Sequence, residues 1–268
     1  LIPVPTFAEY EQALESVGAE VEHVLLKEED EFRVQDSFID WLHKDLDMVF
    51  LCNPNNPTGM LTDREFLFRL LRVCRELGIF LVVDECFQDF IREPGQYSLK
   101  AQLPRYHNLF LLKAFTKRYA MAGVRLGYGI TENQELLEKM TQVTQPWNIS
   151  IPAQAAGIAA LGEVEYVEKA RNLIFEESEY LSEELYKLGM TVFPSQANYL
   201  FFKGPEDLFE ICVGQNVLIR DCSNYPGLGR GFYRVAVRTH EENERLIQAI
   251  HDGLMEARKK AQEEEVEE

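Results

Sequence analysis

The amino-acid sequence predicts an α/β fold, with a mostly parallel sheet sandwiched by helices and a smaller α+β domain at the C-terminal end. Three observations lead to this prediction. Apolar runs without polar alternation, such as residues 48–52, are typical of strands that are buried on both faces. Stretches with Leu and Phe at helical spacing separate these runs. After about residue 152 the strand-like pieces alternate polar and apolar residues, which indicates a small, largely antiparallel sheet.

The first half of the chain alternates between predicted helices and strands. Residues 9–26 are predicted to form a helix, a glycine stop and a strand, and residues 64–78 form a helix that Gly78 ends. The predicted buried strands are residues 47–52, 79–85, 108–115 and 124–130. In sheets of this kind ligands sit beyond the carboxyl ends of the strands, so the residues that follow these strands are the candidate site residues.

The second half has a different pattern. Residues 153–189 carry a long amphipathic helical pattern. The strand-like pieces that follow are residues 190–193, 198–203, 217–221 and 232–239. A closing helix is predicted over residues 239–260, with Thr239 as its N-cap and acidic residues in its first turn. We therefore predict a large domain over residues 1–155 and a small α+β domain over residues 156–268, which includes the linking helix and a charged tail.

Composition and charge exclude several classes of partner. The 268 residues carry a formal net charge of −18, with 46% apolar and 27% charged residues, which is typical of a soluble globular protein. Nucleic acid and anionic membranes would repel this charge, so we expect neither as a partner. No apolar run approaches the roughly 20 residues that a bilayer requires, and the first residues carry no basic segment of the kind that begins a signal peptide. We expect a cytoplasmic location.

The cysteines and histidines do not indicate a metal site. The five cysteines are an odd number without a CxxC pair, and most lie in or beside apolar runs. This pattern is typical of reduced, mostly buried thiols in a cytosolic protein. The five histidines are scattered without ligand spacing, so we expect no metal.

Polar residues follow three of the predicted buried strands. The turn CNPNNPTG (52–59) follows the first, Asp84 ends the second and Lys117 follows the third. Each has an ordinary structural explanation: a rigid turn, a helix cap and a solvated lysine, while Arg125 could pair with a surface carboxylate. Their shared place at strand ends and their complementary chemistry favour one common site instead.

Four motifs resemble those of the fold-type I pyridoxal-phosphate (PLP) enzymes, the aspartate aminotransferase superfamily with class I and II aminotransferases. The motifs are NPNNPTG (53–59), DECF (84–87), FTK (115–117) with a later arginine, and RVAVR (234–238). Their order and spacing fit the family over essentially the whole chain. The resemblance implies an enzyme with PLP as cofactor, a small-molecule amino-acid substrate and a homodimer. The opening stretch LIPVPTFAEY resembles an interior segment of the family, so we expect an N-terminally truncated large domain.

The resemblance implies a role for each matching residue. Lys117 would bind the cofactor aldehyde covalently, and Asp84 would pair with the pyridine nitrogen. Asn56 would donate a hydrogen bond to the ring oxygen and lie beside the substrate. Arg125 would bind the cofactor phosphate, for which a bidentate and permanently charged donor is suited. Arg234 would hold the substrate α-carboxylate.

Two positions depart from the family pattern. Phe87, which we expect beside the cofactor, stands where many relatives carry Tyr, so one hydrogen bond to the ring oxygen is absent. Ala114 stands where the family usually has a hydroxyl residue that bonds the phosphate, and Thr116 is the candidate to replace it.

Three short segments decide between branches of the family. Phe87, residues 217–228 and RVAVRT (234–239) look most like threonine-phosphate decarboxylase, an enzyme of cobalamin biosynthesis. The resemblance therefore implies decarboxylation of a phosphorylated amino acid, L-threonine O-3-phosphate. Transamination of histidinol phosphate or another amino acid is the alternative. Arg220 and Arg238 could meet a substrate phosphate, or could form salt bridges at the domain boundary.

Two further functions have weaker support. GLGRG (227–231) is similar to the dinucleotide loop of a dehydrogenase, but it precedes a predicted strand and does not open a helix. The other is an inactive PLP-type fold that serves as a binding module, which the expected truncation would allow.

Overall fold

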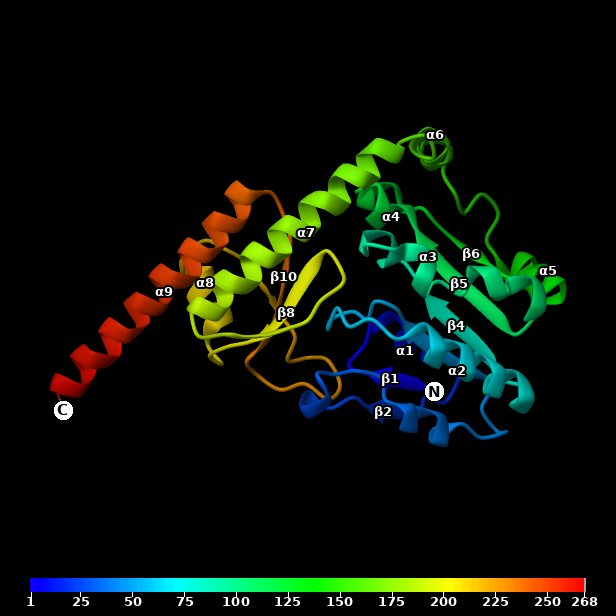
Figure 1. Ribbon diagram of the computed structural model, residues 1–268, viewed down its shortest axis with the longest axis horizontal. Coiled ribbons are helices and arrows are strands. Elements are labelled where there is room, and N and C mark those ends of the chain that lie inside the picture. Colours follow the sequence, from blue (N-terminus) through cyan, green and yellow to red (C-terminus); the bar gives the residue numbers. More distant parts are fainter. Residues whose placement is uncertain (268) are drawn as a thin grey trace.

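The computed structural model shows two β-sheet units connected by the long helix α7 (Val164–Lys187), as seen in Figure 1. The structure describes the backbone of residues 1–267 and the side chains of residues 1–260, 262 and 263. One unit holds a four-stranded, mostly parallel sheet, and the other a four-stranded antiparallel sheet. The predicted fold class is confirmed. The division into domains at residues 155 and 156 stays a prediction.

The first sheet has the order β3 (Met48–Cys52), β4 (Phe80–Asp84), β5 (Leu109–Ala114) and β6 (Gly127–Ile130). The first three strands are parallel and β6 is antiparallel to β5. The prediction of a buried strand at residues 124–130 is wrong in one respect, because three of the four β6 residues are exposed. Among the described residues β6 is the edge of this sheet, so one side of the strand has no neighbour.

Helix α2 (Arg64–Leu77) packs its apolar side against this sheet. Its start is fixed by Asp63, whose side chain accepts a hydrogen bond from the Glu65 amide, and its end by Gly78, which adopts the left-handed conformation with φ of 79°. Apolar residues that α2 and β3–β5 share form the core of this unit. Its fully buried members include Val49, Leu51, Leu67, Leu70, Leu71, Cys74, Leu81, Val83, Leu109 and Leu111.

A small layer lies beside β3, the first strand of this sheet. It consists of β1 (Ile2–Val4), the parallel strand β2 (His23–Leu25) and α1 (Glu9–Ser16). Tyr10 from α1 is buried against Cys52 at the end of β3. The layer therefore brings the first helix to the carboxyl edge of the main sheet.

The second sheet has the order β7 (Thr191–Phe193), β8 (Tyr199–Lys203), β10 (Phe232–Ala236) and β9 (Arg220–Asp221), all antiparallel. Helices α7, α8 (Leu208–Gly214) and α9 (His240–Glu267) cover it, and their apolar residues form a separate core. The predicted cap of α9 is confirmed in position: the Asn243 amide bonds the Thr239 carbonyl, and the Thr239 hydroxyl donates to Glu242 at 2.9 Å.

Shorter elements connect these parts. The remaining helices are α3 (Pro94–Tyr97), α4 (Phe115–Arg118), α5 (Gln134–Val143) and α6 (Ile151–Ala160). Short 3-10 turns are η1 (Glu28–Asp30), η2 (Asp36–Trp41), η3 (Gln88–Phe90), η4 (Lys100–Arg105) and η5 (Ala122–Val124).

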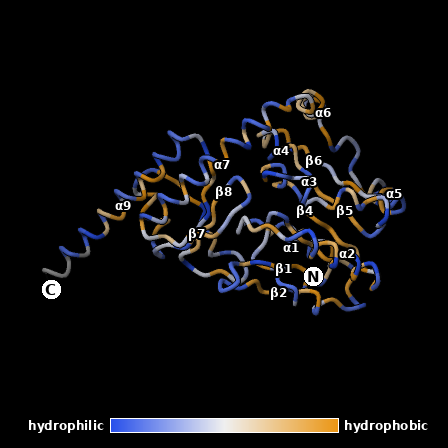
Figure 2. The backbone as a smooth tube through the Cα atoms, viewed as in Figure 1, coloured by the Kyte–Doolittle hydropathy of each residue, from blue (hydrophilic) through white to orange (hydrophobic). Residues whose placement is uncertain are grey.

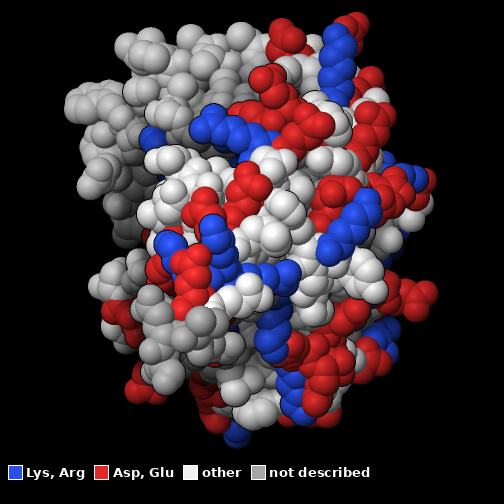
Figure 3. Space-filling view, turned by 90° about the vertical axis from the view of Figure 1, so that its left-hand side faces the viewer, with Lys and Arg blue, Asp and Glu red and all other residues white. Residues whose placement is uncertain are grey.

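The surface reflects the composition. The central strands are coloured hydrophobic in Figure 2, whereas the exposed turns and much of α9 are hydrophilic. Acidic side chains are spread over the face shown in Figure 3, with Lys and Arg side chains between them. Within residues 1–267 we find no helix with the length and apolar character needed to cross a bilayer.

Candidate active site

Three of the candidate segments start from one edge of the mostly parallel sheet. Cys52, Asp84 and Leu112 are register partners across β3, β4 and β5. The asparagine-rich turn follows β3 directly, and α4, which carries Lys117, follows β5. The parallel direction of these strands therefore brings the amides, the carboxylate and the amine to the same edge.

The asparagine-rich turn divides its amides between structure and site. The Asn53 side chain accepts a hydrogen bond from the Thr62 amide at 2.7 Å, and the Asn55 side chain bonds Thr6 and Thr58. Both asparagines are buried within the protein. Only Asn56 has a side chain that lines the adjacent cavity. The side chains of Asn53 and Asn55 thus stabilise the turn, and the side chain of Asn56 faces the cavity.

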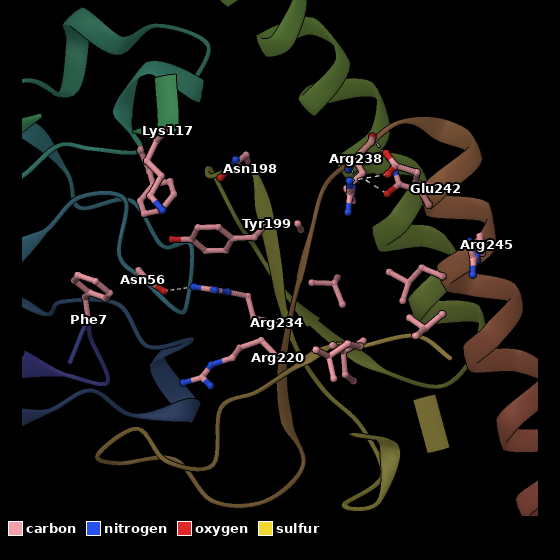
Figure 4. A pocket seen from close by; sticks show the side chains of 18 of the residues that line it. Phe7, Asn56, Lys117, Asn198, Tyr199, Arg220, Arg234, Arg238, Glu242 and Arg245 are labelled. Atoms are coloured by element: carbon pink, nitrogen blue, oxygen red, sulfur yellow. Dashed lines mark hydrogen bonds and ion pairs between the residues drawn. The ribbon is translucent and has the colours of Figure 1, made fainter. Parts of the chain in front are cut away.

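A cavity of about 900 Å³ lies between this edge and the antiparallel sheet. Figure 4 shows that its wall combines side chains from both units. Residues that line it include Asn56, Phe87, Lys117, Tyr199, Arg220 and Arg234. Four of the seven predicted site residues, at positions 56, 87, 117 and 234, therefore meet in one cavity.

Lys117 lies in the cavity wall above an aromatic ring. Its amine is 5.4 Å from the centroid of the Phe87 ring, within the range of a cation–π contact. The Phe87 ring meets Tyr199 edge to face, with centroids 5.1 Å apart. Among the described residues the Lys117 amine has no hydrogen-bond or ion-pair partner besides this ring contact. The amine is thus available to a ligand in the cavity.

Arg234 extends from β10 toward the asparagine turn. Its guanidinium donates a hydrogen bond to the Asn56 side-chain oxygen (Figure 4), and its central carbon is 4.9 Å from the centroid of the Tyr199 ring. The Tyr199 hydroxyl donates to the Asn55 carbonyl at 2.8 Å. These contacts connect β8 and β10 of the second sheet to the turn of the first.

Arg220 is the direct neighbour of Arg234. The two residues are register partners on β9 and β10, so both side chains stand on the same face of the antiparallel sheet. Arg220 donates to the Asn224 side chain at 3.0 Å. Within the part of the chain that the structure describes, neither guanidinium has a carboxylate partner. Arg238 differs, because it forms an ion pair with Glu242 at 2.7 Å on the α9 side of the cavity.

Asp84 lies behind this wall and is half-buried. Its carboxylate accepts hydrogen bonds from the Tyr10 hydroxyl at 2.6 Å and from the Cys86 amide at 2.8 Å. Burial raises the pKa of Tyr199 well above its usual value, and the charges of Cys52 and Asp84 add to the rise while Arg234 opposes it. The charge of Asp84 therefore helps to raise the pKa of Tyr199, which lines the cavity.

The other predicted residues lie outside the cavity wall. Arg125 is exposed, adopts a φ of 53° and donates to the Ala122 carbonyl at 3.0 Å. Thr116 is half-buried in α4, next to Lys117. Ala114 and Thr116 do not contribute to the wall of the large cavity, and Ala114 lines a smaller cavity of about 180 Å³. The predicted roles of Arg125 and Thr116 at a phosphate stay predictions.

Sequence reasoning missed three aromatic residues. Phe7 and Tyr199 line the cavity, and Tyr10 bonds Asp84. The rings of Phe7 and Tyr10 meet edge to face with centroids 5.5 Å apart. Two aromatic residues three positions apart at a helix start are the only local signal that could have pointed to this pair.

The side chains present fit PLP. A primary amine without a partner suits an aldehyde, a carboxylate held by two donors suits the pyridine nitrogen, and an amide next to an arginine suits the ring oxygen and a substrate carboxylate. No group of three or more His, Cys, Asp or Glu residues that could hold a metal ion occurs among the described residues.

Comparisons with known proteins point the same way. The family model for aminotransferase class I and II matches residues 1–250. The chain is 36% identical over 258 residues to threonine-phosphate decarboxylase from Salmonella typhimurium, which covers 95% of this chain and 70% of that protein. It is 32% identical to histidinol-phosphate aminotransferase from Methanopyrus kandleri, with 95% and 65% covered.

A solved structure shares the fold. The histidinol-phosphate aminotransferase from Clostridium acetobutylicum superposes with a TM-score of 0.88 at 32% identity, covering 93% of this chain and 75% of that one. The match to the family model and the similarity to these relatives show that the chain belongs to the aminotransferase class I and II family of PLP-dependent enzymes.

Proposed function

We propose that this protein acts on a phosphorylated amino acid and decarboxylates L-threonine O-3-phosphate with PLP. The observation that carries the proposal is the pair formed by Arg220 and Arg234. Two like charges that face each other across neighbouring strands destabilise a sheet. A ligand with two anionic groups would make this pair of arginines favourable, because each guanidinium could bind one of the groups. A phosphorylated amino acid is such a ligand, since it carries a carboxylate and a phosphate.

Each arginine has its own part in this proposal. Arg234, oriented by Asn56 and Tyr199, would hold the α-carboxylate. Arg220, which lies beside it and contacts Asn224, would hold the phosphate. Arg238 is the weaker candidate for the phosphate because Glu242 already neutralises it.

The cofactor would be held by the residues that follow the sheet strands. Lys117 would bind its aldehyde, Asp84 its ring nitrogen and Asn56 its ring oxygen, while Phe87 would lie against the ring. Arg125 and Thr116 would bind the phosphate. When bound, PLP supplies a ring that takes up the electron pair released when a bond at the substrate Cα breaks.

Lys117 would also move the proton that completes the reaction. Loss of the carboxylate as carbon dioxide would leave the substrate Cα to be protonated, and the Lys117 amine, which lies in the cavity wall, would donate that proton. A transaminase would use the same amine to take a proton from Cα. The choice between the reactions depends on how Arg234 orients the carboxylate.

Phosphothreonine distinguishes these reactions. We expect carbon dioxide release by the PLP-loaded protein, which Lys117→Ala abolishes. Arg220→Gln should raise the KM by about tenfold or more, because a charge-assisted hydrogen bond contributes about 1.5 to 3 kcal/mol. Arg238→Gln is the matched control with little change. Keto-acid formation without carbon dioxide would favour the aminotransferase, and a protein that binds PLP without turnover would be an inactive relative.

We also propose a homodimer. Large apolar side chains around α6 are exposed, with 95% of Trp147, 81% of Ile151 and 74% of Ile158 accessible. Figure 2 shows α6 as largely hydrophobic at the edge of the molecule. Ile151 and Ile158 are seven residues apart and share one helix face, which a second copy would cover. Light scattering should give a dimer mass, and Ile151→Asp with Ile158→Asp should give a monomer.

The thiols support a cytoplasmic location. All five cysteines are free, and four of them are buried. We propose that the protein works in the reducing cytoplasm, where such thiols persist. Cell fractionation would test this, and recovery outside the cytoplasmic fraction would contradict it.

A further inference from the structure

We propose that Tyr10 is a positioning residue that fixes the Asp84 carboxylate for the pyridine nitrogen of the cofactor. The inference rests on the proposed binding of PLP by Asp84 and Lys117. It adds a residue that lies outside all four sequence motifs, 74 residues away from the carboxylate it contacts.

The hydrogen bonds at Asp84 define the plane of its carboxylate. The Tyr10 hydroxyl donates to Oδ2 at 2.6 Å, and the backbone amide of Cys86 donates to Oδ1 at 2.8 Å. Each oxygen therefore has one donor, and two fixed donors remove the rotational freedom of the group. Each oxygen keeps a further lone pair for a ring N–H.

Tyr10 is itself held rigidly. Its side chain is only 6% exposed. Its ring stacks on Phe50 with centroids 5.4 Å apart, and it meets Phe7 edge to face. Because Phe50 belongs to β3, the hydroxyl is anchored to the same sheet that carries Asp84. Packing thus restricts the donor before any ligand binds.

The Tyr10 hydroxyl remains a donor over the working pH range. Burial raises its pKa well above the usual value, and Cys52 and Asp84 add to the rise. The Tyr10 ring also packs against Phe7, which lines the cavity. Tyr10 therefore supports the cavity wall and the carboxylate with one ring.

A buried tyrosine hydroxyl whose hydrogen bond only stabilises the core would affect the stability of the protein and nothing else. A positioning residue affects the cofactor through Asp84, and this difference can be measured. Tyr10→Phe removes only the hydroxyl and keeps the ring contacts with Phe7 and Phe50. Tyr233→Phe is the matched control. Tyr233 is also buried and its hydroxyl donates one hydrogen bond, to the Pro205 carbonyl at 2.7 Å, but it belongs to the core of the second sheet.

The experiment measures PLP affinity, the absorbance spectrum of the bound cofactor with its pH titration, and unfolding by urea. For Tyr10→Phe we expect PLP to bind about tenfold more weakly, as for the loss of one hydrogen bond to a charged group, with a shifted titration midpoint. Tyr233→Phe should leave both readouts unchanged. In an Asp84→Asn background, Tyr10→Phe should have no further effect on affinity, because Tyr10 acts through that carboxylate.

The outcomes separate the inference from the proposed function. Wild-type affinity and titration in Tyr10→Phe, or an equal tenfold loss in both backgrounds, would overturn the role of Tyr10 while the proposed function stands. If the wild-type protein forms no cofactor absorbance band that borohydride abolishes, the proposed function fails, and the inference fails with it.

Discussion

The Lys113 amine lies 2.9 Å from the carboxylate of Glu85, a side chain that is completely buried. Glu85 also accepts hydrogen bonds from the Ser98 hydroxyl and the Leu99 amide, and its own amide bonds the Leu112 carbonyl. Lys113 in turn donates to Gln88 at 3.0 Å. This ion pair ties β5 to the turn after β4 next to Asp84.

Lys113→Met should destabilise the protein by about 3 kcal/mol, because removal of one partner leaves a buried charge uncompensated. Urea unfolding at neutral pH measures this free energy. Lys113→Arg keeps the charge and should lose much less. A loss below about 0.5 kcal/mol for Lys113→Met would show that Glu85 is compensated by other donors.

Alkaline pH should destabilise the fold through its buried thiols. Burial raises the pKa of Cys74 from 9.0 to about 12. Between these values the unfolded chain loses a proton that the folded chain keeps. Stability from this group is therefore complete below pH 9 and falls as the pH rises toward 12.

The measurement is the free energy of unfolding in urea at pH 8 and pH 10. One group with such a shift contributes a fall of at most about 1.4 kcal/mol per pH unit. Cys74→Ala should reduce the difference between the two pH values, although it lowers stability at both. An unchanged difference would mean that Cys74 has no part in it.

Arg125→Gln tests the predicted phosphate contact. The loss of charge-assisted hydrogen bonds, about 1.5 to 3 kcal/mol, should weaken PLP binding by about tenfold to a hundredfold. Fluorescence titration of PLP into the cofactor-free protein gives the Kd. Arg118→Gln is the control, because Arg118 is paired with Asp89 and lines the smaller cavity. Equal affinities in Arg125→Gln and wild type would remove Arg125 from the site.

Leu181→Ala tests the two-domain proposal. Leu181 on α7 is fully buried in the core under the antiparallel sheet, and a substitution of this kind costs about 2 to 5 kcal/mol. If the two units unfold separately, calorimetry should show two transitions, of which only one shifts. Leu70→Ala, in the core of the first unit, should shift the other. A single transition that both variants lower would show one cooperative unit.

The buried strands could be predicted because their signal is local. β3, β4 and β5 each contain a nearly continuous apolar run, and polar residues that end or follow these runs mark the edge where the candidate site lies. Helix α2 could be predicted for the same reason, since Asp63 and Gly78 mark its ends. Helix α8, with only seven residues, has too short a pattern to be recognised.

Contacts between distant segments could not be predicted. The pairing of Arg220 with Arg234 depends on the register of β9 and β10, and nothing local in either segment encodes that register. The contact between Tyr10 and Asp84 depends on how α1 packs beside β3. The division of labour within the asparagine turn, in which Asn53 and Asn55 stabilise the turn that presents Asn56, likewise follows from tertiary partners.

The thiols of Cys52 and Cys86, which lie near Asp84, bear on how the site reacts with an aldehyde. Burial raises the pKa of both Cys52 and Cys86, and the charge of Asp84 adds to the rise. Sulfur is a strong nucleophile only as a thiolate, so these two side chains remain unreactive at neutral pH. A carbonyl compound that enters this region therefore meets no thiolate from Cys52 or Cys86, and alkylating reagents should leave the two sulfurs untouched as long as the chain stays folded.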